Sequence, residues 1–333
     1  MAVDRHLMII GGDIGSGPQD SVFIAPAGPE DEIGQWRESP HPLPQPLAEH
    51  TTVEVERKVF VIGGTNGRAA QRIVFSADMA DGGEVGPWRP SSALLPVPLR
   101  GQSSVAIRRD VFVIGGSDEV GKPQDRVYKA SLGAAGDLGL WQILGSLPRP
   151  VAYAAAARAG DTVYLIGGEN EKGPVQDVYA GFAGRGGDLN WKSQGSLPKP
   201  SSRGAAFVDG DKLYYVGGRD GTTPSLETYM VTINSDGSLG DWQRWLSLPR
   251  GMIGLAAALL NGKAYLAGGF DGARFQSSLI YAPVGEPATV VLARSAPMGR
   301  RTGTLSVAIA ISGLVALLSL LVVAFALIIE RRH

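Results

Sequence analysis

The sequence predicts an all-β fold, a propeller of six four-stranded antiparallel blades, followed by one C-terminal transmembrane helix. Three observations predict it. Apolar runs end in a Gly-Gly doublet six times, at a nearly constant spacing. A tryptophan and then a Leu-Pro pair follow most of the doublets at similar distances. Residues 305–329 form a stretch of 25 residues without a charged side chain.

The doublets set the period of the chain. They begin at Gly11, Gly63, Gly115, Gly167, Gly217 and Gly268. The steps between them are 52, 52, 52, 50 and 51 residues. A constant period of this length indicates one supersecondary unit that is copied along the chain. The apolar run before each doublet, such as residues 59–62, predicts a buried strand that ends there.

Each unit contains signals for three more strands. A short β-type run such as residues 177–179 follows the doublet, and a Gly/Asp cluster then predicts a hairpin turn. The next strand begins at a tryptophan, which we expect to pack between neighbouring blades. These tryptophans are Trp36, Trp88, Trp141, Trp191 and Trp242. After Leu-Pro comes a strand of small residues such as 205–208, joined to the next apolar run by Asp-Gly or Asn-Gly.

Repetition explains why the units should form a ring. A single four-stranded sheet leaves both faces open, whereas copies packed side by side around an axis bury them. Small side chains suit the crowded strand nearest the axis. We therefore assign residues 1–297 to the propeller, 298–304 to a linker, 305–329 to the helix and 330–333 to a charged tail.

The first and last units depart from the pattern. Residues 2–6 align with the end of a small-residue strand, so most of the first innermost strand is absent from unit one. Three explanations remain: a chain that begins further upstream, an open ring, or a strand supplied by residues 304–311. Unit six has no tryptophan, and we expect residues 290–292 to provide its fourth strand.

The uncharged segment has the length of a membrane span. Twenty-five residues of helix extend about 37 Å, and a hydrocarbon core is about 30 Å thick. The basic residues on the two sides of the segment nearly balance: Arg300 and Arg301 precede it, and Arg331 and Arg332 follow it. They therefore do not decide the orientation of the helix in the membrane. The incomplete first unit favours an exported propeller anchored at its C-terminal end over a cytoplasmic, tail-anchored one.

Composition excludes several functions. Residues 300–333 carry a net charge of +3, so the remainder of the chain carries −4. That remainder therefore lacks the basic surface expected of a nucleic-acid-binding protein. The chain has no cysteine, so it has neither disulfides nor thiolate metal sites. Its four histidines show no metal-ligand spacing. We expect no metal, no cofactor and no catalytic residue set.

The combination of an apolar run into Gly-Gly, a following tyrosine, a spaced tryptophan and Leu-Pro resembles the kelch repeat. The resemblance covers about residues 2–297 and implies the propeller fold. It does not imply one activity, because kelch propellers host binding proteins, actin-associated proteins and a few enzymes. The copper oxidases among them need a cysteine-modified tyrosine, which this chain cannot form.

Polar residues just before the small-residue strands are the candidates for a binding site. Equivalent positions of all blades gather at one mouth of the central channel. The candidates are Glu49, His50, Arg100, Gln102, Tyr153 and Arg203. A ring of such residues would bind an anionic ligand or a partner loop. The arginines would alternatively only bridge neighbouring blades.

Two functions follow from these features. The first is a membrane-anchored, non-catalytic propeller that binds a protein or a glycan through its blade loops and channel mouth. The second is an enzyme that resembles the kelch sialic-acid mutarotases. The resemblance implies that such an enzyme would use Glu49, His50, Arg100 and Arg203. Acid–base catalysis of this kind needs groups with tuned pKa values, which residue types alone do not reveal.

Overall fold

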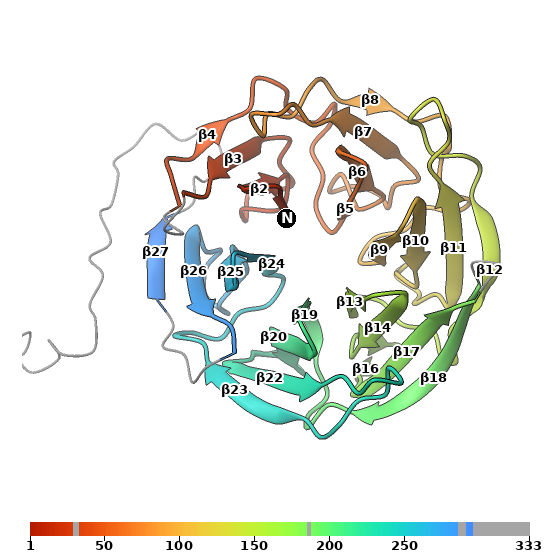
Figure 1. Ribbon diagram of the computed structural model, residues 1–333, viewed down its shortest axis with the longest axis vertical. Helices are drawn as coiled ribbons and strands as arrows, with labels where there is room; N and C mark the ends of the chain where they lie inside the picture. The colour runs from red at the N-terminus through yellow and green to blue at the C-terminus, as the bar shows by residue number, and fades with distance from the viewer. Residues whose placement is uncertain (29–32, 185–187, 286–290, 296–333) are drawn as a thin grey trace, which may run out of the picture.

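The computed structural model describes residues 1–28, 33–184, 188–285 and 291–295 (Figure 1). Six antiparallel sheets stand around a central axis, with the first strand of each nearest the axis and the last at the rim. This arrangement confirms the predicted six-bladed propeller with four-stranded blades. Figure 1 also shows blade VI, the last, standing beside blade I.

The strands follow one another from the axis outward in every blade. Blade I contains β1 (Ala2–Val3), β2 (His6–Ile10), β3 (Val22–Pro26) and β4 (Arg37–Glu38). Blade II contains β5 (Thr51–Val55), β6 (Lys58–Ile62), β7 (Val74–Asp78) and β8 (Arg89–Pro90). Blade III contains β9 (Ser103–Ile107), β10 (Asp110–Ile114), β11 (Arg126–Ser131) and β12 (Gln142–Ser146).

The other three blades repeat this order. Blade IV contains β13 (Ala155–Ala159), β14 (Thr162–Ile166), β17 (Asp177–Ala183) and β18 (Leu189–Ser196), with a small hairpin of β15 (Glu169–Asn170) and β16 (Gly173–Pro174). Blade V contains β19 (Ser202–Asp209), β20 (Lys212–Asp220), β22 (Glu227–Thr232) and β23 (Gln243–Ser247), and β21 (Thr223–Pro224) also pairs with β20. Blade VI contains β24 (Ala256–Leu260), β25 (Lys263–Ala267), β26 (Ser278–Pro283) and β27 (Val291–Ser295).

Apolar side chains along the second strand of a blade point alternately to its two faces and pack against the blades on both sides. Val59 and Val61 of β6 pack into a cluster with blade I. Phe60 and Ile62 of the same strand pack into a cluster with blade III. Successive side chains of a strand point to opposite faces, so one apolar run serves two interfaces. Full burial of each such side chain stabilises the fold by about 1.5–3 kcal/mol.

Two of the predicted tryptophans, Trp88 and Trp141, hydrogen-bond to the segments that connect blades. The indole nitrogen of Trp88 in blade II donates a hydrogen bond to the carbonyl of His41, at 3.1 Å, in the segment that enters that blade. Trp141 in blade III makes the equivalent bond to the carbonyl of Ala93, at 2.9 Å. Each indole therefore ties its own blade to the segment that arrives from the blade before it.

The doublets make a second, regular contact between blades. The amide of the second glycine donates to a main-chain carbonyl of the segment that leads into the next blade. These bonds join Gly12 to Leu47, Gly64 to Leu99, Gly116 to Val151, Gly168 to Ser201 and Gly218 to Met252, at 2.8–2.9 Å. The first glycine lies against the same carbonyl: a Cβ on Gly167 would stand 2.3 Å from the oxygen of Ser201. Only glycine fits there, at a φ of +59°.

Ion pairs link the turns between first and second strands on the opposite face of the ring. Arg57 of blade II pairs with Asp4 of blade I, and Arg109 of blade III with Glu56 of blade II, both at 2.7 Å. Arg108 of blade III also pairs with Asp161 of blade IV. All of these side chains are solvent-exposed, so each pair contributes at most about 1 kcal/mol.

The two irregular units look as the sequence suggests. The innermost strand of blade I, β1, has two residues, whereas its counterparts in the other blades have five or eight. β27 pairs with β26 and completes blade VI without a tryptophan. The linker (298–304), the membrane helix (305–329), the tail (330–333) and the strand candidate (304–311) lie outside the described residues. Among the residues that are described, no helix has the length and hydrophobicity needed to cross a bilayer.

We predict that Gly167→Ala destabilises the protein by about 3 kcal/mol, because it adds steric overlap with the next blade to backbone strain. Gly160→Ala is the matched control, since Gly160 has a φ of +56° with no atom near the position of its Cβ. That variant should lose only about 1 kcal/mol. Chemical denaturation measures both, and equal losses would contradict the proposed close contact.

Candidate functional site at the channel mouth

In blades II to VI, one residue near the start of the inner strand joins a chain of hydrogen bonds around the mouth. The amide of each donates to the carbonyl of its counterpart in the preceding blade: Gly101 to Glu49, Tyr153 to Gly101, Arg203 to Tyr153 and Gly254 to Arg203. All five have a positive φ, between 52° and 68°. Three of them are not glycine, although this conformation is strained for other residues. The side chains at these three positions form the candidate site.

Glu49 is the first centre of the site. One oxygen of its carboxylate accepts a hydrogen bond from the Tyr153 hydroxyl at 2.9 Å, and the other accepts one from Arg203 at 3.0 Å. The Arg203 guanidinium carbon also lies 3.5 Å from the centre of the Tyr153 ring, close enough for a cation–π contact. Residues of blades II, IV and V thereby meet across the mouth.

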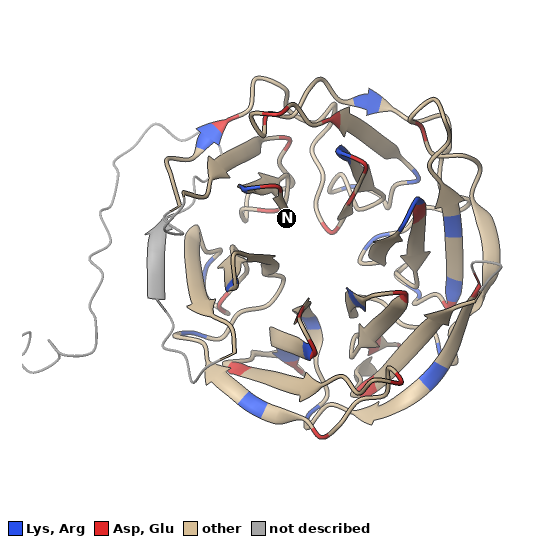
Figure 2. Cartoon of the chain, viewed as in Figure 1, with Lys and Arg blue, Asp and Glu red and all other residues tan. Residues whose placement is uncertain are grey.

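Glu169 is the second centre. It accepts a hydrogen bond from Arg219 at 2.7 Å and from the Ser202 hydroxyl at 2.9 Å. Arg203 reaches it as well, at 3.4 Å. Arg203 therefore bridges both carboxylates. Figure 2 shows that both acidic and basic residues occur on the inner side of the ring.

Arg100 completes the cluster without a committed partner. Its guanidinium lies 3.8 Å from Glu49 Oε2, which is too far for a hydrogen bond. Within the described residues its side chain makes no hydrogen bond, and 37% of it is exposed. Three guanidinium groups thus face two carboxylates, so the cluster has an excess positive charge and donors left to offer.

The pKa values follow from these contacts. Burial and the neighbouring Glu49 carboxylate raise the pKa of Tyr153 to about 12, against the opposing effect of Arg203. Burial alone would raise the pKa of Glu169, but hydrogen bonding to Arg219 and the charge of Arg203 hold it below its ordinary value. At neutral pH the tyrosine is therefore a neutral donor and the carboxylate is ionised.

Two cavities adjoin the cluster. One, of about 450 Å³, lies between the loops of blades III and IV and is lined by Lys122, Tyr153, Glu169 and Asn170 among others. The other, of about 370 Å³, lies between blades VI and I and reaches Glu49 and His50. Each cavity shares at least one side chain with the charged cluster.

The structure brings together four of the six residues that the sequence singles out. Glu49, Arg100, Tyr153 and Arg203 form the cluster. Gln102 is 4% exposed and donates to the carbonyl of Ile62, so it lies between blades instead.

His50 lines the second cavity rather than the cluster. Burial lowers its pKa to about 4, so it is neutral at pH 7.

Sequence reasoning missed Glu169, Arg219 and Ser202. A usable signal exists for the first two, because each directly follows a Gly-Gly doublet. Positions after the doublets therefore form a second set of mouth residues. No group of three or more His, Asp or Glu side chains among the described residues is arranged to hold a metal ion.

Comparison with known proteins identifies the repeat. The model of the KLHDC2/KLHL20/DRC7 Kelch-repeats domain matches residues 49–269. The chain belongs to the kelch-repeat family. The solved structure of YjhT superposes with a TM-score of 0.70 over 87% of this chain and 95% of that one, at 16% sequence identity. That likeness shows the fold alone.

A short part of the chain is similar in sequence to one group of curated proteins. The N-acetylneuraminate epimerases of Salmonella enteritidis PT4 and Salmonella typhi are 41% identical to this chain over 51 residues. The match covers 15% of this chain and spans 13% of the length of these relatives.

Proposed function

We propose that the channel mouth binds a carboxylate-bearing sugar, such as the acidic residue of a glycan, and that the propeller acts as a non-catalytic binding module. One observation carries the proposal: Arg100 offers uncommitted donors beside a cluster with excess positive charge. Guanidinium groups recognise carboxylates through paired hydrogen bonds, which favours an anionic ligand over a neutral one.

The surroundings of the cluster suit a sugar. The cavity beside Tyr153 and Glu169 has about 450 Å³, within the range of small-molecule sites. Asn170 and Lys122 add polar groups to its lining. The Tyr153 hydroxyl oxygen, whose proton is donated to Glu49, and the ionised Glu169 can both accept hydrogen bonds from sugar hydroxyls. The local similarity to N-acetylneuraminate epimerases supports an acidic sugar over an acidic loop of a protein partner.

Mutarotation of such a sugar is a second candidate function, and the same local similarity favours it. Opening the sugar ring requires removal of a proton from the anomeric hydroxyl and delivery of one to the ring oxygen. Glu49 is the carboxylate nearest to accept the first proton. Tyr153 would have to supply the second, but its only proton is donated to Glu49 at 2.9 Å, and its raised pKa makes it a weak acid. Both features favour binding without catalysis.

Membrane attachment is the other part of the proposed function. Residues 305–329 have the length and the uncharged composition of a spanning helix. We place the propeller on the extracytoplasmic side, where glycans are presented; a cytoplasmic, tail-anchored propeller is the alternative.

Arg100→Gln is expected to weaken binding of N-acetylneuraminate about tenfold, because one charge-assisted hydrogen bond is lost. Isothermal titration calorimetry measures the affinity. The control is Arg89→Gln, an exposed arginine on the rim strand β8, which should bind like the wild type. The methyl ester of the sugar should bind weakly to all three proteins. Equal affinity for acid and ester would refute recognition of the carboxylate.

The binding-only proposal predicts that the protein leaves anomerisation of N-acetylneuraminate at its uncatalysed rate, as followed by proton NMR. An acceleration that Glu49→Gln removes, and that Glu38→Gln on the exposed strand β4 retains, would instead establish the second candidate. Measuring the affinity of both variants for the sugar shows whether Glu49→Gln removes a general base or abolishes ligand binding.

For the anchor, the full chain expressed with its membrane is expected to resist alkaline carbonate extraction, because the helix lies within the bilayer. A chain ending at residue 297 should be released. Release of the full chain would refute the anchor, and protease accessibility of the propeller in intact cells decides its side.

A further inference from the structure

Blade VI departs from the repeat at two positions of the loop that follows its doublet. The first is the residue directly after the doublet, which is Phe270 in blade VI. The same position is polar in each of the other five blades. Its occupants there are Asp13, Thr65, Ser117, Glu169 and Arg219.

The second position is the last residue of the same loop. The amide of the residue that follows it donates to the carbonyl of the second glycine in every blade. Blade VI has Phe275 at this position, whereas four blades have proline and one has alanine. These residues are Pro18, Ala70, Pro123, Pro174 and Pro224. Five blades therefore build the loop without an aromatic ring, so the fold does not require the two phenylalanines.

Phe270 and Phe275 pack as a pair. Their ring centres lie 5.1 Å apart, with the ring planes inclined by 48°. The Phe275 ring also lies against the backbone of Gly15 in blade I, where a Cβ would stand 2.9 Å from it. Both phenylalanines are half-buried, and neither belongs to the hydrophobic clusters at the blade interfaces next to them.

The side chain of Asp271 fixes the loop that carries the pair. One carboxylate oxygen accepts hydrogen bonds from the amides of Ala273 and Arg274, at 2.9 and 2.8 Å. The other accepts one from the side-chain amide of Gln276 at 2.7 Å. Because the loop is already held in one conformation, a ligand would not lose affinity by ordering it.

The pair lies beside the charged cluster. Glu169 and Arg219 occupy equivalent positions of neighbouring blades, and their side chains are 2.7 Å apart. Phe270 occupies that position in the next blade, so it follows Arg219 around the mouth. Its main chain exchanges hydrogen bonds of 2.8 and 3.0 Å with Ile253, which directly precedes the mouth position Gly254.

The mouth has free space on this side. A Cβ on Gly254 would have no described atom within 4 Å. The other glycine at a mouth position, Gly101, is covered by the Tyr153 ring, which a Cβ would meet at 2.3 Å. The side chains of the cluster therefore fill the mouth at blade III and leave it open at blade VI.

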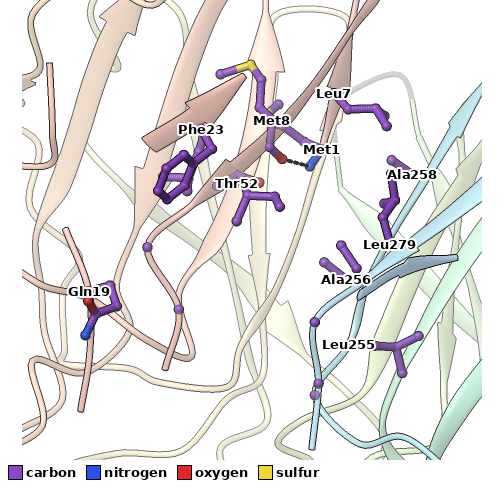
Figure 3. A pocket seen from close by; sticks show the side chains of 18 of the residues that line it. Met1, Leu7, Met8, Gln19, Phe23, Thr52, Leu255, Ala256, Ala258 and Leu279 are labelled. Carbon is purple, nitrogen blue, oxygen red and sulfur yellow. Dashed lines mark hydrogen bonds between the residues drawn. The ribbon is translucent and has the colours of Figure 1, made fainter. Parts of the chain in front are cut away.

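A cavity of about 370 Å³ adjoins the open side. Gly254 and Glu49 are among the residues that line it. Figure 3 shows Leu255, which follows Gly254, on one side of this cavity and Met8 and Phe23 on the other. A ligand held at the cluster therefore has room to extend toward blade VI.

We propose that Phe270 and Phe275 bind a neutral sugar that is linked to the acidic sugar at the cluster. This inference rests on the proposed function and makes the ligand a glycan chain instead of a free monosaccharide. A pyranose ring presents C–H groups on its apolar face, and the electron-rich face of an aromatic ring attracts them. The chain passes over Gly254, where no side chain stands in its way.

A linked acidic sugar agrees with binding without catalysis. Its anomeric carbon carries the glycosidic bond, so it has no anomeric hydroxyl from which a proton could be removed. Ring opening and mutarotation are then impossible, and the mouth needs no general acid. The same charged groups still recognise the carboxylate.

The test compares N-acetylneuraminate with sialyllactose, in which that sugar is linked to galactose and glucose. By isothermal titration calorimetry the wild type is expected to bind the trisaccharide about tenfold more tightly, through the added contact with the aromatic pair. Phe270→Leu and Phe275→Leu should each remove most of this gain, because they keep an apolar side chain but lose the ring. Both variants should bind the monosaccharide like the wild type.

The control is Phe182→Leu, a half-buried aromatic on β17 of blade IV, which should keep the full gain. Equal affinity of the wild type for the two ligands would overturn this inference and leave the proposed function standing. An equal loss for both ligands in the Phe270 and Phe275 variants would also overturn it, since the rings would then only support the loop. Absence of binding for both ligands would refute the proposed function and this inference with it.

Discussion

The hydrogen bond from the second glycine of each doublet to the main chain of the next blade is the contact on which the ring depends. It joins backbone to backbone, so it fixes the angle and distance between blades independently of their side chains. The first glycine keeps the same approach close, because a Cβ there would overlap the accepting carbonyl. With this contact in place, the apolar runs that precede the doublets bury one face against each neighbour.

At the channel mouth the backbone repeats from blade to blade, but the side chains at equivalent positions differ. The residues at 49, 153 and 203 occupy a backbone conformation that favours glycine, and glycine does occupy the equivalent positions 101 and 254. The strained conformation turns the three side chains toward a shared cluster. Charged residues after the doublets of blades IV and V complete it. A main-chain ring thus supplies equivalent positions, and the side chains at those positions determine what the mouth recognises.

The repeat pattern made the fold predictable, since spacing, turn residues and strand runs are all local signals. The mouth was predictable only in part. Glu49 and Arg203 meet across 154 residues of sequence, and equivalence between repeats is the only sequence signal that relates them. That signal places His50 and Gln102 near the mouth too, but both lie one residue past a cluster residue or its equivalent and point between blades. Glu169 and Arg219 were not predicted as site residues, because the Gly-Gly doublet before each of them was interpreted only as a feature of the fold.

Ion pairs between the turns on the opposite face join blade I to II, II to III and III to IV. Glu49 belongs to blade II and Tyr153 to blade IV, and main-chain hydrogen bonds join the same blades at the mouth. This arc of the ring is therefore held at both of its faces. The separation between Glu49 and Tyr153 should vary little in solution, so the two side chains are preorganised for whatever the mouth binds.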